Sequence, residues 1–234
     1  MKQPISLRKT ARAGGILYLV IILTGIFGEI FVRGKLIVQG DPDATAKNIM
    51  DFPLLWRAGI ANDLLMHVCD IPLLIIFYTL FRPVNKFWTL TALLFALVQS
   101  AVLVAFKLNL FTSLIFLEHP AYLQSFRAAQ MNILSYVSII MDGYGFGVGL
   151  LFFGFACLIF GQLIFVSGFI PRIIGRLMQL AGLCYIINSF ALILAPKFAS
   201  TLFPWIMMPS FIGESSFCLW LIIKGVREVG DGEW

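Results

Sequence analysis

Two aspartates and a histidine lie inside an apolar stretch of this chain, in the segment ANDLLMHVCDIP at residues 61–72. Asp63, His67 and Asp70 are spaced i, i+4 and i+7, so on a helix they fall within about 60° of one another. Such a polar stripe could bind a proton or a cation, or carry out acid–base chemistry. Pro72 follows directly and can kink the helix beside the stripe.

The residues around this stripe have the composition of a membrane protein. Of 234 residues, 60% are hydrophobic and 12% are charged, whereas soluble domains are about half apolar and about a quarter charged. Apolar runs of about 20 residues are long enough for a helix to cross the hydrocarbon core of a bilayer. We therefore predict an all-α fold, a polytopic integral membrane helix bundle that forms a single unit over residues 1–234. Its six spans are expected at about 13–32, 58–81, 87–112, 143–166, 174–195 and 203–224.

Residues 120–142 are more polar than the six spans. Gln124, Arg127 and Gln130 argue against a membrane crossing in the first part of this segment. We predict an amphipathic helix that lies at the outer face and leads into the fourth span. A re-entrant segment is the alternative.

The positions of lysine and arginine predict the orientation in the membrane. Ten of these residues lie at one set of span ends and six at the other. This bias predicts that the protein lies in the inner (cytoplasmic) membrane with both termini in the cytoplasm. The net charge of +5 is then a topology signal, and we expect the lipid bilayer, not a nucleic acid, as a partner. The ten are Lys2, Arg8, Lys9, Arg12, Arg82, Lys86, Arg172, Arg176, Lys224 and Arg227.

Glycines recur every seven residues through the fourth span and into the fifth. Seven residues return a helix to nearly the same face, and small residues let two helix backbones approach closely in a bilayer. The spacing predicts that the fourth and fifth spans pack as a close antiparallel pair. The glycines concerned are Gly147, Gly154, Gly161, Gly168, Gly175 and Gly182.

Each of the remaining spans carries polar residues that could join the stripe of the second span. By depth they fall in the outer half or near the middle of the membrane, which predicts a pocket that opens to the outer face. Acidic residues outnumber basic ones among them, with Arg57 at the rim. Some acids are therefore expected to be protonated, or a cation to be bound. The additional candidates are Glu29, Lys107, Asp142, Asn188 and Glu214.

The spacing of the other reactive residues does not indicate a known enzyme. The four cysteines are scattered singly, and neither HExxH nor GxSxG occurs, so we predict no metal site and no cofactor. The leading hypothesis is binding or transport of a small ligand, cationic or a proton, and not catalysis. One alternative is an intramembrane enzyme that uses Asp63, His67 and Asp70 for acid–base chemistry. The other is a non-catalytic membrane partner whose polar side chains only hold helices together.

Several longer segments resemble a widespread bacterial membrane family. They are ARAGGILYL (11–19), GDPDATAKNI (40–49), LWRAGIANDLL (55–65) and GESSFCLWLIIKGV (213–226). The family is the one described as domain of unknown function 4386, and the resemblance covers nearly the whole chain. It implies a multi-pass helical membrane protein of bacterial origin and assigns no site residue. Lys107 is not a feature of the resemblance, so a role for Lys107 would be particular to this chain.

Overall fold

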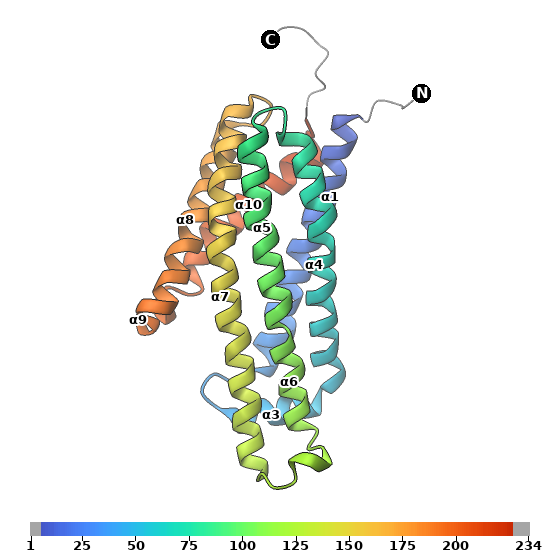
Figure 1. The fold of residues 1–234 in the computed structure, drawn as a ribbon, viewed down its shortest axis with the longest axis vertical. Helices are drawn as coiled ribbons and strands as arrows, with labels where there is room; N and C mark the ends of the chain where they lie inside the picture. The colour runs from blue at the N-terminus through green and yellow to red at the C-terminus, as the bar shows by residue number, and fades with distance from the viewer. Residues whose placement is uncertain (1–5, 227–234) are drawn as a thin grey trace. The chain divides into compact units, whose positions relative to one another are not determined.

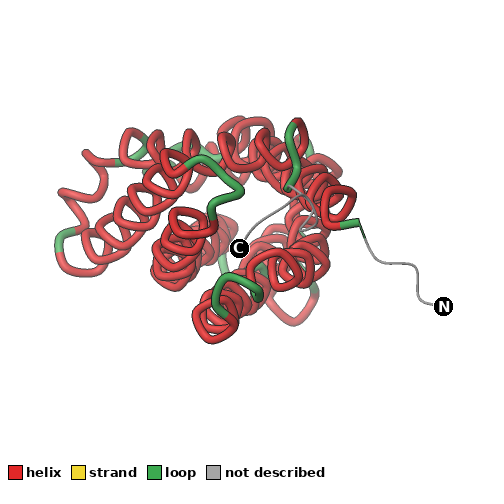
Figure 2. The backbone as a smooth tube through the Cα atoms, turned by 90° about the horizontal axis from the view of Figure 1, so that it is seen from above, coloured by secondary structure: helices red, strands yellow, loops and turns green. Residues whose placement is uncertain are grey.

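The computed structural model describes residues 6–226, and these residues form helices and connecting loops without any strand (Figure 2). Six helical stretches are long and apolar enough to cross a membrane, which confirms the predicted all-α fold with six spans. Lys2 and Arg227, which contributed to the predicted orientation, lie outside the described residues. The six stretches are Leu7–Leu36, Pro53–Phe81, Lys86–Leu117, Ala128–Ser167, Arg172–Leu194 and Trp205–Ile223.

Short elements interrupt or join the spanning helices (Figure 1). The first, third and sixth spans are each built from more than one element, and α3, α9 and the 3₁₀ turn η2 lie between spans. In chain order the elements are α1 (Leu7–Ile26), η1 (Phe27–Arg33), α2 (Gly34–Leu36), α3 (Pro42–Asp51), α4 (Pro53–Phe81), α5 (Lys86–Phe106), α6 (Leu108–Leu117), η2 (Ala121–Leu123), α7 (Ala128–Ser167), α8 (Arg172–Leu194), α9 (Pro196–Leu202), η3 (Trp205–Met207) and α10 (Met208–Ile223).

The chain forms two compact units, which we describe separately. The described residues of unit 1 are 6–21, 69–100 and 147–226, and unit 2 consists of residues 22–68 and 101–146. Four helices, α1, α4, α5 and α7, each supply residues to both units. The polar residues of the long helices are therefore divided between the units according to where they lie along each helix.

Most of the segment 120–142, predicted as an amphipathic helix that leads into the fourth span, is part of α7 itself. Only the residues before Ala128 lie in the connection between α6 and α7, and from Ala128 onward the segment is the first part of the 40-residue α7. Met131, Ser135 and Ile139 are buried, and their spacing of four places them on one face of the helix. This face packs inside unit 2, so residues 128–142 form one continuous helix with the fourth apolar stretch.

In unit 1, α7 and α8 lie side by side with their backbones in contact (Figure 1). A Cβ atom on Gly161 would lie 2.6 Å from the carbonyl oxygen of Gly175, and one on Gly182 would lie 2.5 Å from that of Gly154. Such distances leave no room for a side chain. The four glycines therefore allow the close approach that their spacing predicts.

Two other glycines of the predicted series, Gly147 and Gly168, behave differently. Gly147 packs against a side chain, since a Cβ there would lie 2.3 Å from Cδ2 of Leu192. Gly168 lies beyond the end of α7 with φ +74°, and no atom of another element lies within 4 Å of its Cβ position. Gly168 is therefore a turn residue and not a packing residue, because a left-handed backbone is what the reversal into α8 requires.

Replacing Gly161 by alanine is expected to lower the free energy of unfolding by about 1–3 kcal/mol, because the new methyl group must push two backbones apart. Gly143, in the same helix, is a matched control, since its Cβ would meet nothing within 4 Å. Gly143→Ala should be neutral or stabilising by up to about 1 kcal/mol. Unfolding of both variants in mixed micelles measures the difference, and equal stabilities would contradict the close packing.

Aromatic side chains form the core of unit 1. Phe77 and Phe81 of α4 pack against Phe160 of α7 and Phe217 of α10, with ring centroids 5.3 to 6.2 Å apart for these interhelical pairs. Tyr18 of α1 meets Phe77 and Phe217 edge to face. These contacts place the hydroxyl group of Tyr18 inside the unit.

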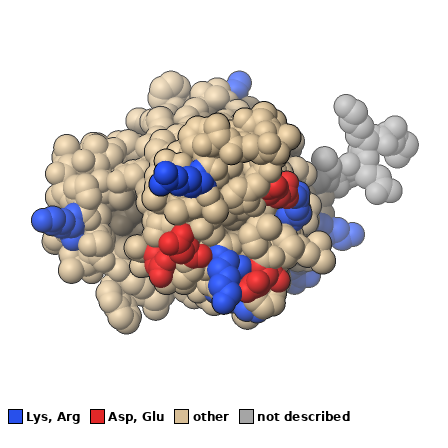
Figure 3. Space-filling model, turned by 90° about the horizontal axis from the view of Figure 1, so that it is seen from below, with Lys and Arg blue, Asp and Glu red and all other residues tan. Residues whose placement is uncertain are grey.

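At one end of unit 2 lie α3 and the connection between α6 and α7. Asp41 caps α3 by accepting a hydrogen bond from the backbone N of Ala44 at 2.9 Å, and Pro42 occupies the first turn. Trp56 of α4 is fully buried, and its Nε1 donates to the carbonyl oxygen of Leu110. Exposed acidic and basic side chains are mixed on this end (Figure 3).

Candidate functional site

Helix α4 places Asp63 and His67 in unit 2 and Asp70 in unit 1. Asp63 and His67 are buried, with 1% and 5% of their surface exposed, and Asp70 is partly buried. The helix stays continuous through Pro72. The polar stripe predicted from the spacing therefore faces protein, but Asp63 and Asp70 contribute to two different polar groups.

In unit 2, a lysine lies between two aspartates from different helices. Nζ of Lys107 donates a hydrogen bond to Oδ2 of Asp142 at 2.9 Å and lies 3.3 Å from Oδ2 of Asp63. All three side chains are at most 7% exposed. An ammonium group bridges two carboxylates in the interior of an apolar helical unit.

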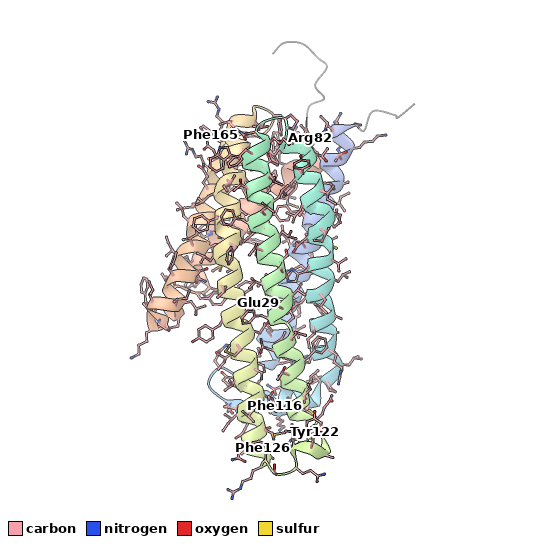
Figure 4. The ribbon with its side chains drawn as sticks, in the orientation of Figure 1. Glu29, Arg82, Phe116, Tyr122, Phe126 and Phe165 are labelled. Carbon is pink, nitrogen blue, oxygen red and sulfur yellow. The ribbon has the colours of Figure 1, made fainter. Side chains whose placement is uncertain are left out.

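Arginine and glutamate from the first span extend this arrangement. Nη1 of Arg33 donates to Oδ2 of Asp63 at 2.6 Å, and its Nε donates to Oε2 of Glu29 at 2.8 Å. Glu29 lies on η1 (Figure 4) and its side chain is 59% exposed. We call Glu29, Arg33, Asp63, Lys107 and Asp142 the charged cluster.

The buried part of the charged cluster is close to electrically balanced. Asp63 and Asp142 carry two negative charges, and Lys107 and Arg33 carry two positive charges. Burying an ion pair in a medium of low polarity is tolerable only when each charge has a partner. Among these four buried side chains, acidic and basic groups are therefore equal in number, and the exposed Glu29 adds a third acid to the charged cluster. Arg57, expected at the rim, pairs instead with Glu118 at the surface, where both side chains are half exposed.

Two interruptions of regular helix occur at the residues of the charged cluster. Within the first span, η1 is a π-helical segment and carries Glu29 and Arg33. Within the third span, Lys107 lies at the break between α5 and α6. Gly28 gives the cluster room, because a Cβ there would lie 2.5 Å from Oδ1 of Asp63. Local departures from α-helical geometry are frequent at functional sites.

One oxygen of each buried aspartate accepts no hydrogen bond. Oδ1 of Asp63 and Oδ1 of Asp142 are buried, and neither has a donor among the described residues. A buried acceptor without a donor is costly, and such groups in proteins call for a specific explanation. These two oxygens are the buried carboxylate acceptors of the charged cluster that lack a donor among the described residues.

Unit 1 holds a second polar group, centred on Glu214 of α10. The hydroxyl of Tyr18 donates to Oε2 of Glu214 at 2.8 Å, and the hydroxyl of Tyr185 donates to Oε1. On α4, Asp70 accepts a hydrogen bond from Oγ of Ser100 at 2.6 Å. These carboxylates bond to neutral hydroxyl groups, whereas those of the charged cluster bond to cations.

The predicted site residues are thus placed in two groups. Unit 2 holds Glu29, Asp63, His67, Lys107 and Asp142, and unit 1 holds Asp70, Asn188 and Glu214. Among residues 6–226, no three His, Cys, Asp or Glu side chains gather in a way that could hold a metal ion.

Arg33 is the member of the charged cluster that the sequence analysis missed. The first span was expected to end at residue 32, which left Arg33 in an outer loop. The helical stretch instead continues to Leu36. A signal was present, since Arg33 follows Glu29 by four residues and such pairs meet on one helix face.

Comparisons with known proteins describe what the chain is similar to. A family model described as "Domain of unknown function (DUF4386)" matches residues 13–225. An "Uncharacterized protein" of Archaeoglobus fulgidus is 28% identical over 167 residues, covering 71% of this chain and 83% of that protein. No solved structure matches the chain.

Proposed function

We propose that this chain, which belongs to the family described as Domain of unknown function (DUF4386), is a membrane protein that exchanges a small cation for a proton at the charged cluster. Membership confirms the resemblance drawn from the sequence, and the family description names no activity. One observation carries the proposal: the ammonium group of Lys107 is buried between the carboxylates of Asp63 and Asp142.

The need to keep the net charge of the charged cluster constant couples cation binding to proton release. A net charge inside a membrane costs roughly 2.5–3.5 kcal/mol or more, so a cation that enters must be offset by the loss of another positive charge. Lysine can lose its proton when its surroundings no longer favour the charged form, whereas arginine stays charged. The cation binds, the Lys107 ammonium becomes a neutral amine, and one proton leaves. The net charge of the cluster is then unchanged.

The two aspartates supply the ligands for the incoming cation. Oδ1 of Asp63 and Oδ1 of Asp142 have no hydrogen-bond donor, and carboxylate oxygens are suitable ligands for small inorganic cations and for protonated amines. Arg33 holds Asp63 in place through its 2.6 Å hydrogen bond and does not take part in proton release. The polar group around Glu214 is not required for this step.

We further propose a multi-pass arrangement in the cytoplasmic membrane, with both termini in the cytoplasm. The six apolar helices and the basic residues at one set of helix ends support it. Bacterial origin remains part of the proposal, and the relative from an archaeon indicates that similar chains are not confined to bacteria.

Proton release on cation binding tests the exchange directly. The purified protein, in detergent and almost unbuffered solution with a pH indicator, receives lithium, sodium, potassium or methylammonium chloride in separate titrations. We expect one of these cations to release about one proton per chain, as charge balance requires. Choline chloride serves as the control for ionic strength. Lys107→Met should abolish the release, because it removes the group that gives up the proton.

The surface pair of Arg57 and Glu118 provides a matched control. Arg57→Met removes a cation from unit 2 outside the charged cluster, and its proton release should equal that of the wild type. Circular dichroism and gel filtration show whether each variant is folded. Proton release that persists in folded Lys107→Met protein contradicts the exchange. If the folded wild-type protein releases no proton with any of the cations, the exchange is contradicted and the charged cluster has a purely structural role.

A further inference from the structure

One end of unit 1 is strongly basic. The described residues of this unit include two acidic side chains, Asp70 and Glu214, and both lie within spans. Exposed lysines and arginines gather where α1 begins, where α4 meets α5, where α7 meets α8 and where α10 ends. Figure 4 labels Arg82 and Phe165 at this end. The basic residues are Arg8, Lys9, Arg12, Arg82, Lys86, Arg172, Arg176 and Lys224.

A groove of about 420 Å³ opens at the same end, between the start of α5 and the last turns of α7. Leu158, Ile159 and Val166 make most of its wall apolar. Trp88 also lines the groove and is about half exposed. Tryptophan prefers the interface between hydrocarbon and water, so the groove runs from the interface into the apolar layer. Its volume is within the range of roughly 300–1,000 Å³ that is typical of ligand sites.

A chain of hydrogen bonds links the groove to an arginine. Gln162 lines the groove and accepts from Nε2 of Gln179 at 3.0 Å, and Oε1 of Gln179 accepts from Nη1 of Arg176 at 3.0 Å. The guanidinium groups of Arg176 and Arg172 lie 4.2 and 5.5 Å from the ring centre of Phe165. The ring and the amide hold Arg176 in a defined position, which lowers the entropy lost when its other N–H groups bind a ligand.

We propose that this groove binds an anionic phospholipid, with one acyl chain between α5 and α7 and the phosphate on Arg176 and Lys86. The apolar wall suits a hydrocarbon chain, and the basic residues beside it suit a negative headgroup. Lys86 begins α5 and follows directly on Asn85, a residue of the groove wall. Positively charged pockets between helices at the cytoplasmic side of a membrane are a common way to hold anionic lipids.

The charge distribution favours this occupant over a zwitterionic lipid. Phosphatidylcholine would bring a positive choline group to a surface that already carries eight exposed basic residues and whose unit has its described acids within the spans. Phosphatidylglycerol brings only negative charge. The inference is independent of the proposed exchange, because none of the residues that it uses belongs to the charged cluster.

Lipid affinity of the delipidated full-length chain tests the proposal. Native mass spectrometry in detergent, with phosphatidylglycerol and phosphatidylcholine of identical acyl chains, gives the two affinities. We expect tighter binding of phosphatidylglycerol, and about a fivefold loss of that affinity in each of Arg176→Gln and Lys86→Gln. Lys197→Gln is the matched control, because Lys197 is an exposed basic residue of unit 1 on α9, far along the chain from the groove. It should leave the affinity unchanged.

A second measurement uses the wild-type protein and does not depend on the stability of charge variants. Phosphatidylglycerol brominated on its acyl chains should quench the fluorescence of Trp88, seen as the difference between wild type and Trp88→Phe. Equal affinity for the two lipids, or no quenching of Trp88, overturns the proposal. Equally tight binding of glycerol phosphate also overturns it, because that outcome assigns the basic residues to a free anion without an acyl chain.

Discussion

Replacing Lys107 by methionine is expected to lower the free energy of unfolding by about 3–5 kcal/mol, the usual cost of removing one partner from a buried ion pair. Methionine nearly preserves the length of the side chain, so the loss reports on charge more than on volume. Asp142 loses the cation that lies 2.9 Å away, and Asp63 keeps only Arg33. Reversible unfolding in mixed micelles of a mild and a denaturing detergent measures the change.

A second substitution separates charge from packing in this experiment. Lys107→Met combined with Asp142→Asn removes one positive and one negative charge together. The double variant should be more stable than the sum of the two single losses predicts, with a coupling of about 0.5–3 kcal/mol. Arg57→Met breaks an exposed pair and should cost at most about 1 kcal/mol. A loss for Lys107→Met no larger than that for Arg57→Met would show that the buried bridge contributes little to stability.

The number of spans could be predicted from the sequence, but their ends could not. A run of about 20 apolar residues identifies a crossing because it matches the hydrocarbon thickness. The helix that contains the run ends where packing and hydrogen bonding end it. The first span therefore extends to Leu36, and the fourth begins at Ala128 because the face with Met131 packs inside unit 2.

Helical periodicity placed Asp63 and His67 on one buried face, since neighbours on a single helix follow from spacing alone. Partners on other helices do not. The bridge from Asp63 through Lys107 to Asp142 joins three helices that lie far apart in the sequence. Likewise, nothing in the spacing of Tyr185 and Glu214 indicates that their side chains meet. Such pairs depend on how the helices pack.

The departures from regular helix would also have been hard to predict. No proline lies in η1 or at Lys107, so the common sequence signal for a distorted helix is missing. In the structure, both departures coincide with charged residues that reach a shared partner, Asp63. We infer that pairing of these charges across helices stabilises the local distortion, which is not imposed by a proline.

The three acids of the charged cluster are expected to differ in importance, with Asp63 first. Asp63→Asn leaves Arg33 and Lys107 facing each other without the carboxylate that both contact. It should lower the free energy of unfolding by about 3–5 kcal/mol, as for a buried charge that loses its partner. Asp142→Asn should cost less, because Lys107 still lies 3.3 Å from Asp63. Glu29→Gln should cost at most about 1 kcal/mol, since the Glu29 side chain is 59% exposed.

This order depends on the geometry and not on the mere presence of three acids in apolar helices. If the acids did not depend on pairing with Arg33 and Lys107, the three asparagine and glutamine variants would have similar stabilities, because each substitution removes one negative charge. If Asp142 were the central acid, its variant would be the least stable. The same unfolding assay, applied to all three variants in one detergent mixture, distinguishes these outcomes. The expected order places Asp63 at the centre because it alone contacts two cations from two other helical stretches.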